Sequence, residues 1–337
     1  MKKGLKISLV VICSILVLYL VLAVFPRSFN YKLDNPMRTD SDLPILIAHG
    51  GGNKEFPDNT LEAFYNAYSV DTRVMMETDV SITKDGVVIL SHDVTLDRKT
   101  NVTGNICDWN YSDLMSQKVD FGYTNPTNNQ QLTGERVHFK DENGVEKFPT
   151  DVEYPEGVLP RDEKVFLATT LEELIVTFPN NRINVEIKQS GEVGFKALKE
   201  ILRLLEKYDA FDRVVLASFH EELYKEYQRL QKEGLVPDNF MYSPATKSVT
   251  KFFIFQMLKL DLFYSDKICV FQLPTEQYGF NLATKSLIKA AHRNNIAVHY
   301  WTVNEVEEMK HLINIGADGI MTDYPHRLKD VYDNQKK

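Results

Sequence analysis

The chain has 337 residues, with 39 Lys and Arg against 47 Asp and Glu, which gives a formal net charge of −8. This length fits one large domain or two small ones, and the hydrophobic share of 43% and charged share of 26% are ordinary for a globular protein. The acidic balance argues against sequence-independent nucleic-acid binding, which requires a basic face, but it leaves room for a phosphate substrate at a locally positive site.

The chain begins with lysines that are followed by a long apolar run. Residues 7–25 carry no charge and as a helix would span about 28 Å, close to the hydrocarbon thickness of a bilayer. A cleaved signal peptide is the alternative, but the run is long for one and residues 23–25 are a poor cleavage site. We expect a single-pass transmembrane anchor over residues 1–28. The leading lysines favour a cytoplasmic N-terminus, so the following domain is expected outside the cytoplasm, at the cell membrane.

A polar, proline-containing linker over residues 29–43 precedes a regular alternation of strands and helices. Apolar runs predict eight strands, at 44–50, 75–83, 183–188, 214–219, 240–243, 268–273, 297–302 and 319–322. Amphipathic stripes predict helices between them, one from residue 59 and others at 171–178, 194–208, 221–231, 252–262, 284–295 and 305–315. Such alternation is typical of parallel βαβ units, so we predict a (β/α)8 TIM barrel over 44–330, with an open doubly wound sheet as the alternative.

One stretch interrupts this alternation after the second strand. Asp85-Gly86 is a hairpin signal that leads into a further apolar strand at 87–93. From about residue 94 to 167 the periodicity is lost, and the sequence is rich in Asn, Thr, Asp, Gly and Pro. That is too long for an ordinary loop, so we predict an inserted subdomain.

Two acidic residues lie close together in the strand at 75–83. Glu77 and Asp79 are two apart, so an extended backbone points both carboxylates to the same side. Burying them uncompensated is costly, and a hard divalent cation such as Mg²⁺ or Ca²⁺ would resolve the conflict. The alternative is an edge strand with a solvated acidic face.

Other polar residues interrupt apolar strands at or near their ends, where barrels gather their chemistry. Together they are His49, Glu77, Asp79, His92, Glu186, Lys188 and Trp301. Each alone has a structural interpretation, but chance convergence of all seven is much less probable than a shared function. Three carboxylates, two histidines and a lysine suit metal-assisted phosphoryl chemistry, in which the histidines move protons and the lysine adds charge on phosphate.

At this point the sequence resembles a known family, the glycerophosphodiester phosphodiesterases. The motifs that carry the resemblance lie at 49–51, 57–60, 77–79, 84–86, 92–93, 98–100, 186–188, 218–219, 301–304 and 316–323. Apart from the insertion, the resemblance covers nearly everything from about 44 to 328, and motifs in this order and spacing are highly specific. It implies a barrel with a small insertion after the second strand and a divalent cation, usually Ca²⁺ or Mg²⁺.

The resemblance also implies roles for individual residues. By position, the metal ligands are Glu77, Asp79 and Glu186, and the acid/base pair is His49 and His92. Lys188 would contact phosphate or metal, and Phe219 and Trp301 would line the pocket for glycerol or the alcohol. One departure falls in the substrate site: the family usually has a phosphate-binding arginine directly after the first histidine, where this chain has Gly50.

We therefore expect a membrane-anchored, metal-dependent hydrolase that cleaves glycerophosphodiesters to glycerol 3-phosphate and an alcohol. Lysophospholipids and glycerol-phosphate polymers are plausible substrates, because the anchor would hold the site near both. Two alternatives stay open: a phospholipase C-like enzyme, and a non-catalytic phosphodiester-binding or scaffold protein on the same fold. The intact acids and histidines argue against the second of these, and Gly50 is its only support.

Overall fold

The protein is described by a computed structural model that covers residues 2–24, 31–39, 41–124 and 136–335. The expected anchor, linker and insertion therefore fall partly outside the described residues, at 25–30, 40 and 125–135.

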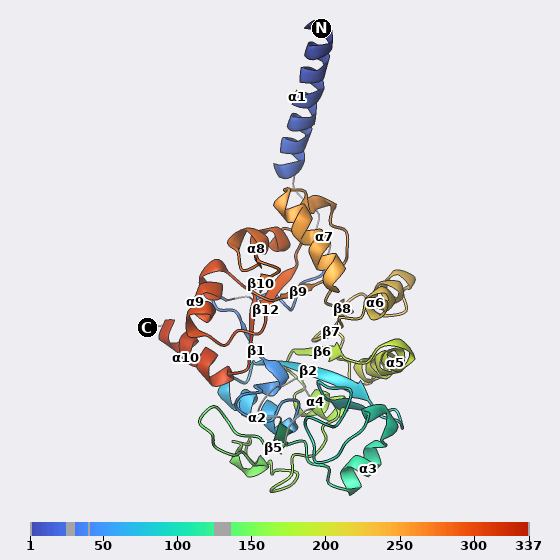
Figure 1. The fold of residues 1–337 in the computed structure, drawn as a ribbon, viewed down its shortest axis with the longest axis vertical. Coiled ribbons are helices and arrows are strands. Elements are labelled where there is room, and N and C mark those ends of the chain that lie inside the picture. Colours follow the sequence, from blue (N-terminus) through green and yellow to red (C-terminus); the bar gives the residue numbers. More distant parts are fainter. Residues whose placement is uncertain (1, 25–30, 40, 125–135, 336–337) are drawn as a thin grey trace.

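Eight parallel strands form a nearly closed barrel with helices around it (Figure 1). In hydrogen-bonded order they are β8 (Met241–Tyr242), β7 (Val214–Ala217), β6 (Ile183–Ile187), β2 (Met75–Ile82), β1 (Ile45–Ala48), β13 (Gly319–Thr322), β12 (Ala297–Tyr300) and β9 (Val270–Leu273). Every neighbouring pair is parallel, and among the described residues no pairing joins β8 to β9. The eight-stranded parallel α/β barrel is confirmed, the open doubly wound alternative is not, and each strand lies within its predicted range.

Helices follow the barrel strands and cover their outer face (Figure 1). They are α2 (Leu61–Val70), α4 (Leu171–Thr177), α5 (Gly191–Lys207), α6 (Glu221–Glu233), α7 (Thr246–Met257), α8 (Lys285–His292), α9 (Val306–Ile315) and α10 (Pro325–Gln335). Thr60 caps α2 by accepting a hydrogen bond from the backbone N–H of Ala63 at 3.2 Å. The helix expected at 252–262 begins earlier and ends sooner, because Lys259 has a φ of 59°, which no helix can continue.

The interior of the barrel is filled in layers by alternate residues of the strands. Ile45, Ile47 and Met75 belong to one buried cluster inside the barrel, whereas their neighbours Leu46 and Met76 pack outward against the helices. Two buried residues of the expected linker, Tyr31 and Met37, join this inner cluster. Since β2 continues from Met75 with the same alternation, its residues 77 and 79 also face the interior.

The segment expected as an insertion packs around its own small apolar cluster. It follows β3 (Val88–Leu90), which pairs antiparallel with β2, and it precedes α4. Its short elements are η2 (Ile106–Asp108), α3 (Tyr111–Ser116), β4 (Tyr123–Thr124), β5 (Val137–His138) and η3 (Pro149–Asp151). The cluster includes the buried side chains of Ile106, Leu114, Phe121 and Phe166. Outside this segment, the remaining short elements are η1 (His49–Gly51), η4 (Asp261–Phe263), β10 (Glu276–Gln277) and β11 (Phe280–Asn281).

The N-terminal helix α1 (Lys2–Val24) projects away from the barrel, and only its end nearest the barrel approaches α7 (Figure 1). The hydroxyl of Tyr19 donates a hydrogen bond to the backbone carbonyl of Leu258, 2.6 Å away. In the part of the chain that the structure describes, no helix is both long and apolar enough to cross a membrane. The transmembrane helix expected at 7–25 is therefore not confirmed.

Candidate active site

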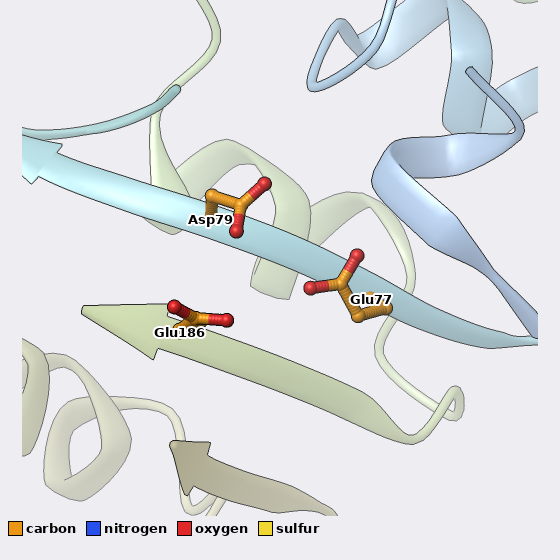
Figure 2. A group of neighbouring side chains, drawn as sticks. All are labelled: Glu77, Asp79 and Glu186. Carbon is orange, nitrogen blue, oxygen red and sulfur yellow. The ribbon is translucent and has the colours of Figure 1, made fainter. Parts of the chain in front are cut away.

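Three carboxylates meet inside the barrel, on two neighbouring strands. Glu77 and Asp79 lie on β2 and Glu186 lies on β6, and the three side chains point toward one another (Figure 2). The register sets Asp79 directly opposite Glu186. One oxygen from each side chain lies within 4.8 Å of the others, and Glu77 and Asp79 are each only 3% exposed. Carboxylate oxygens are the protein ligands that Ca²⁺ and Mg²⁺ prefer, so the residues present fit a divalent cation.

Crowding and burial disturb the ionisation of these acids. Burial, followed by the charge of Asp79, raises the pKa of Glu77 to about 8. Burial likewise raises the pKa of Glu186. The backbone N–H of Gly50 opposes the shift at Glu77 by donating a hydrogen bond to Oε2 at 2.9 Å. The negative charge of the ionised acids is therefore not fully balanced by the surrounding groups, and a bound cation would balance it.

Lys188 supplies part of that charge. Its Nζ atom lies 2.9 Å from Oδ1 of Asp79 and 2.8 Å from Oε1 of Glu186. Burial would lower the pKa of Lys188, but the charges of Asp79 and Glu186 outweigh it and raise the pKa. On its other side Asp79 is held by Asn59, whose side-chain amide donates to Oδ2 at 3.1 Å and accepts from the Asp79 backbone N–H at 3.0 Å. Lys188 thus contacts two acids of the candidate metal centre.

His49 stands directly after β1, at the start of the short helix η1. Its Nδ1 atom lies 2.6 Å from Oδ1 of Asp323, and its Nε2 atom lies 4.0 Å from Oε2 of Glu77. Burial would lower the pKa of His49, but the hydrogen bond with Asp323 and the negative charge of Glu77 raise it to about 10. Asn304 donates a hydrogen bond to the other carboxylate oxygen of Asp323 at 2.8 Å, which fixes that partner in turn.

His92 lies in the same cavity as His49, but it is positioned by the β2–β3 hairpin. It follows β3, which pairs antiparallel with β2 as the hairpin signal at Asp85-Gly86 predicts and is not one of the eight parallel barrel strands. The β2–β3 hairpin turns the chain back, and the N–H of Ser91 donates to the carbonyl of Asp79 at 2.8 Å. His92 Nδ1 then lies 2.9 Å from Oδ1 of Asp93, whose other oxygen contacts Arg98 Nε at 2.5 Å. The hydrogen bond with Asp93 raises the pKa of His92.

Eight of the nine residues singled out in the sequence line one cavity of about 400 Å³. They are His49, Glu77, Asp79, His92, Glu186, Lys188, Phe219 and Trp301. The aromatic rings of Phe219 and Trp301 meet edge to face with centroids 6.0 Å apart, and Phe219 is 59% exposed. The ninth, Gly50, borders the adjoining cavity and has a φ of 55°, a conformation that glycine adopts without strain.

Sequence reasoning missed the partners of the histidines. Asp323 and Asp93 were noted as motif members but were given no role in the site. For Asp323 a signal was present, because it follows the last strand as His49 follows the first. In a closed barrel those strands are neighbours, and the register pairs Ala48 with Thr322, one residue before each.

The chain is similar to known phosphodiesterases over most of its length. Residues 49–327 match the glycerophosphoryl diester phosphodiesterase family. A glycerophosphodiester phosphodiesterase of Caldanaerobacter subterraneus subsp. tengcongensis is 27% identical over 288 residues, which cover 84% of this chain and 96% of that protein. A human lysophospholipase D is 25% identical over 337 residues, covering 94% of this chain and 93% of the relative.

Solved structures show the same fold. The glycerophosphoryl diester phosphodiesterase domain of a Mycobacterium tuberculosis protein superposes with a TM-score of 0.64 at 16% identity, covering 86% of this chain and 98% of that one. A phosphodiesterase of Oleispira antarctica, solved with the product sn-glycerol-3-phosphate, gives 0.59 at 19% identity, with 86% and 97% covered. Because the family match covers residues 49–327, well over half of the chain and including both histidines, the chain belongs to the glycerophosphoryl diester phosphodiesterase family, whose members are phosphoric diester hydrolases.

Proposed function

We propose that this protein hydrolyses glycerophosphodiesters to glycerol 3-phosphate and an alcohol, and lysophospholipids to lysophosphatidate and an alcohol, and that it requires a divalent cation. The observation that carries the proposal is the meeting of three carboxylates, of which Glu77 and Asp79 are buried, with two histidines in one cavity. The names of the relatives support the substrate class, since they include a glycerophosphodiester phosphodiesterase and a lysophospholipase D.

The cation would be held by Glu77, Asp79 and Glu186. A bound Ca²⁺ or Mg²⁺ supplies positive charge to the phosphate oxygens as negative charge builds up on them. The ammonium group of Lys188, which lies within 3 Å of Asp79 and Glu186, would add positive charge that stabilises the same phosphate oxygens. The carboxylates thus serve binding and electrostatics and leave the proton transfers to other groups.

His49 and His92 are proposed as the acid/base pair. Hydrolysis of a phosphodiester requires one proton to leave the attacking oxygen and one to reach the departing alkoxide. Each histidine is held at Nδ1 by a carboxylate, Asp323 or Asp93, which leaves Nε2 as the nitrogen that can exchange a proton with the substrate. Phe219 and Trp301 form the apolar wall against which the glycerol or the alcohol would pack.

We also propose that the protein is held at the cell membrane by α1, with the barrel outside the cytoplasm. The support for the first part is that α1 exposes large apolar side chains along its described length, from Ile7 (60%) to Val21 (48%). Exposed apolar surface of this extent is unusual unless another apolar phase covers it. Membrane attachment is tested by co-sedimentation with membranes, which should survive high salt and be lost in I12K/L16K. The side of the membrane on which the barrel lies is tested by treating intact cells with protease.

The central experiment is an activity assay on purified protein stripped with EDTA. Glycerophosphocholine and a lysophospholipid are each supplied with Ca²⁺, Mg²⁺ or Mn²⁺, and glycerol 3-phosphate and lysophosphatidate are measured. We expect no turnover without metal and glycerol 3-phosphate from the water-soluble substrate with metal. Lysophosphatidate from the lysophospholipid would mark lysophospholipase D activity. Metal binding without turnover of any diester would instead favour a non-catalytic role.

A further inference from the structure

A second cavity, of about 440 Å³, adjoins the catalytic one and is not used by the mechanism above. It lies between the barrel rim and the β4–β5 hairpin of the inserted segment, and His49, Asp79 and His92 line both cavities. The lysine and arginine side chains that line it are those of Lys54, Arg98 and Lys140. Lys54 stands on the rim just after η1, and Lys140 follows β5 in the insertion, so two separate parts of the fold supply lysines to one space.

The acids that face this cavity are already matched by partners. Asp58 contacts Lys99 Nζ at 2.7 Å and Arg98 at 3.5 Å. Asp323 is engaged by His49 and Asn304, as described above, and Asp79 by Lys188. The charge of Arg98 is therefore already paired with the carboxylates of Asp58 and Asp93.

Lys54 and Lys140 differ from Arg98 in that neither is paired with an acid in the described residues. Within the described ranges, no ion-pair partner is found for Lys54 or Lys140, and both line the cavity. The acids of the neighbouring surface are also engaged, since Glu55 contacts His326 at 2.6 Å and Asp141 contacts Lys147 at 3.0 Å. A chain with a net charge of −8 thus presents two uncommitted ammonium groups next to its catalytic histidines.

The position of this cavity indicates what it would bind. A phosphodiester bound to the cation that Glu77, Asp79 and Glu186 would hold lies beside both histidines. Because the two cavities share these histidines, we place its phosphorus where the cavities meet. Its two substituents must then extend in different directions, one along the aromatic wall of Phe219 and Trp301 and the other toward the lysines. A neutral or apolar group gains little from the second direction, whereas an anionic group gains two ammonium partners.

We propose that Lys54 and Lys140 form an anion subsite, which selects glycerophosphodiesters that carry a second phosphate one glycerol unit from the scissile bond. The substrate class is a linked diester of glycerol and phosphate, with bis(glycerophospho)glycerol as its smallest member. This proposal rests on the proposed function, because the first phosphate must be bound at the cation that the three carboxylates would hold. Both lysines border open space, so their attraction is screened by salt, with a Debye length of about 10 Å at 0.1 M and about 3 Å at 1 M.

The test compares two soluble substrates that share the same leaving group chemistry. Glycerophosphoglycerol has one phosphate and bis(glycerophospho)glycerol has two, and kcat/KM is measured for each at 50 mM and 1 M NaCl. We expect wild type to prefer the doubly charged substrate at low salt and K54Q/K140Q to lower that preference about tenfold. Raising the salt should lower the preference of wild type in the same way. K199Q, which removes an exposed lysine on α5 outside both cavities, should leave the preference as it is.

The outcomes separate the subsite from the proposed function. If wild type shows no preference for the doubly charged substrate, or if K54Q/K140Q keeps that preference unchanged, the proposed anion subsite is wrong. Turnover of glycerophosphoglycerol would still support the proposed function. If neither substrate is cleaved, the proposed function is wrong. Calorimetric titration of bis(glycerophospho)glycerol into the metal-loaded proteins then tests the anion subsite by itself. Weaker binding to K54Q/K140Q than to K199Q supports it, and equal binding overturns it.

Discussion

Nδ1 of His49 lies 2.6 Å from Oδ1 of Asp323, and this contact joins the ends of the first and last strands of the barrel. The carboxylate is itself held by the side chain of Asn304 at 2.8 Å. The imidazole therefore has one fixed orientation, with Nε2 turned toward Glu77 and the catalytic cavity. We therefore expect Asp323 to be a positioning residue, which would act on the substrate through His49.

Replacing Asp323 by Asn should weaken catalysis without unfolding the barrel. D323N keeps the shape of the side chain but loses the charge that raises the pKa of His49. We expect kcat to fall about 10- to 100-fold, less than the full loss of a general acid or base. The NMR titration of His49 should move to lower pH in the variant. D330N, on the exposed side of α10, serves as the control, and equal titration curves in D323N and D330N would contradict the assignment.

Metal binding should release a proton. The pKa of Glu77, raised to about 8 by burial and by Asp79, means that this carboxyl is largely protonated at pH 7 in the metal-free protein. A cation that takes the carboxylate as ligand must displace the proton. We expect release approaching one proton per bound Mg²⁺ or Ca²⁺ at pH 7 and little at pH 9, measured in weak buffer. E77Q should bind metal more weakly and release less, and pH-independent release in wild type would count against the site.

The same cation should stabilise the fold. Because the pKa of Glu77 in the folded state lies above its ordinary value of 4.5, the folded metal-free protein binds more protons than the unfolded chain between these values. Its stability should therefore fall as the pH rises from about 4.5 to 8. Saturating metal at 100 times its Kd should add about 2.7 kcal/mol to the free energy of unfolding. Calorimetric scans of wild type, D79N and E186Q check this, and equal metal-induced shifts in Tm in all three would exclude these ligands.

Gly50 should be required for the shape of the site. Its φ is 55°, an added Cβ would stand 3.0 Å from Cβ of Asp58, and its N–H donates to Glu77. G50A should cost about 1–2 kcal/mol for the left-handed backbone alone and should also weaken metal binding. G144A is the matched control, because Gly144 has a φ of 76° with nothing near its Cβ position. A metal affinity lowered equally in both variants would show that the effect is general strain.

The sequence patterns were sufficient for the strands and for most of the cavity. Apolar runs located each barrel strand, and period-two spacing placed Glu77 and Asp79 on the interior face. Closure of the barrel then brings strand ends together whatever their separation along the chain. What the patterns did not contain was register: that Asp79 faces Glu186, and that Lys188 pairs with both, depends on how β2 and β6 align.

Other parts depend on interactions that no local pattern records. The hairpin signal at Asp85-Gly86 predicted the turn between β2 and β3 but not their register, in which the Ser91 N–H donates to the Asp79 carbonyl and brings His92 to the site. Arg98 reads as a motif residue, yet its guanidinium is buried against Asp93 and Asp58, contacts made only in the folded insertion. The apolar run near the N-terminus forms the helix α1, but the described residues do not bear out the predicted membrane span.

Asp318, a member of the last family motif, should be structural rather than catalytic. It is 1% exposed, accepts a hydrogen bond from the Val298 N–H at 2.9 Å and contacts His292 Nε2 at 2.7 Å. Burial would raise the pKa of Asp318, but the hydrogen bond with His292 and its charge lower it. A lowered pKa contributes stability above the ordinary value of 3.8 that is lost as the pH falls through the folded-state value.

D318N should therefore lose about 1–3 kcal/mol of unfolding free energy at neutral pH, as expected for a buried charged hydrogen bond. Urea titrations at pH 7 and pH 3 measure the difference, which should shrink at the lower pH. The kcat of the folded fraction should stay near that of wild type, and a large loss of kcat with unchanged stability would reverse this assignment.

His49→Ala and His92→Ala should each lose at least about 10²-fold in kcat while remaining folded, because a positioned general acid or base contributes about 10²–10⁴-fold. The double variant should lose less than the product of the two, since groups that act as a unit are not additive. If the histidines were only structural, Tm would fall and the specific activity of the folded protein would stay near normal. Circular dichroism and metal titration on each variant separate these cases.

A diester with an activated leaving group distinguishes the two roles. A p-nitrophenyl diester departs without needing a proton, so it should restore most of the activity of whichever variant lacks the general acid. The variant that lacks the base should stay impaired, because its attacking oxygen still has to lose a proton. The two histidines are not equivalent in the structure: His49 is held across the barrel closure by Asp323, whereas His92 is held by its sequence neighbour Asp93. If both variants respond equally to the leaving group, the acid/base assignment fails even with the metal site intact.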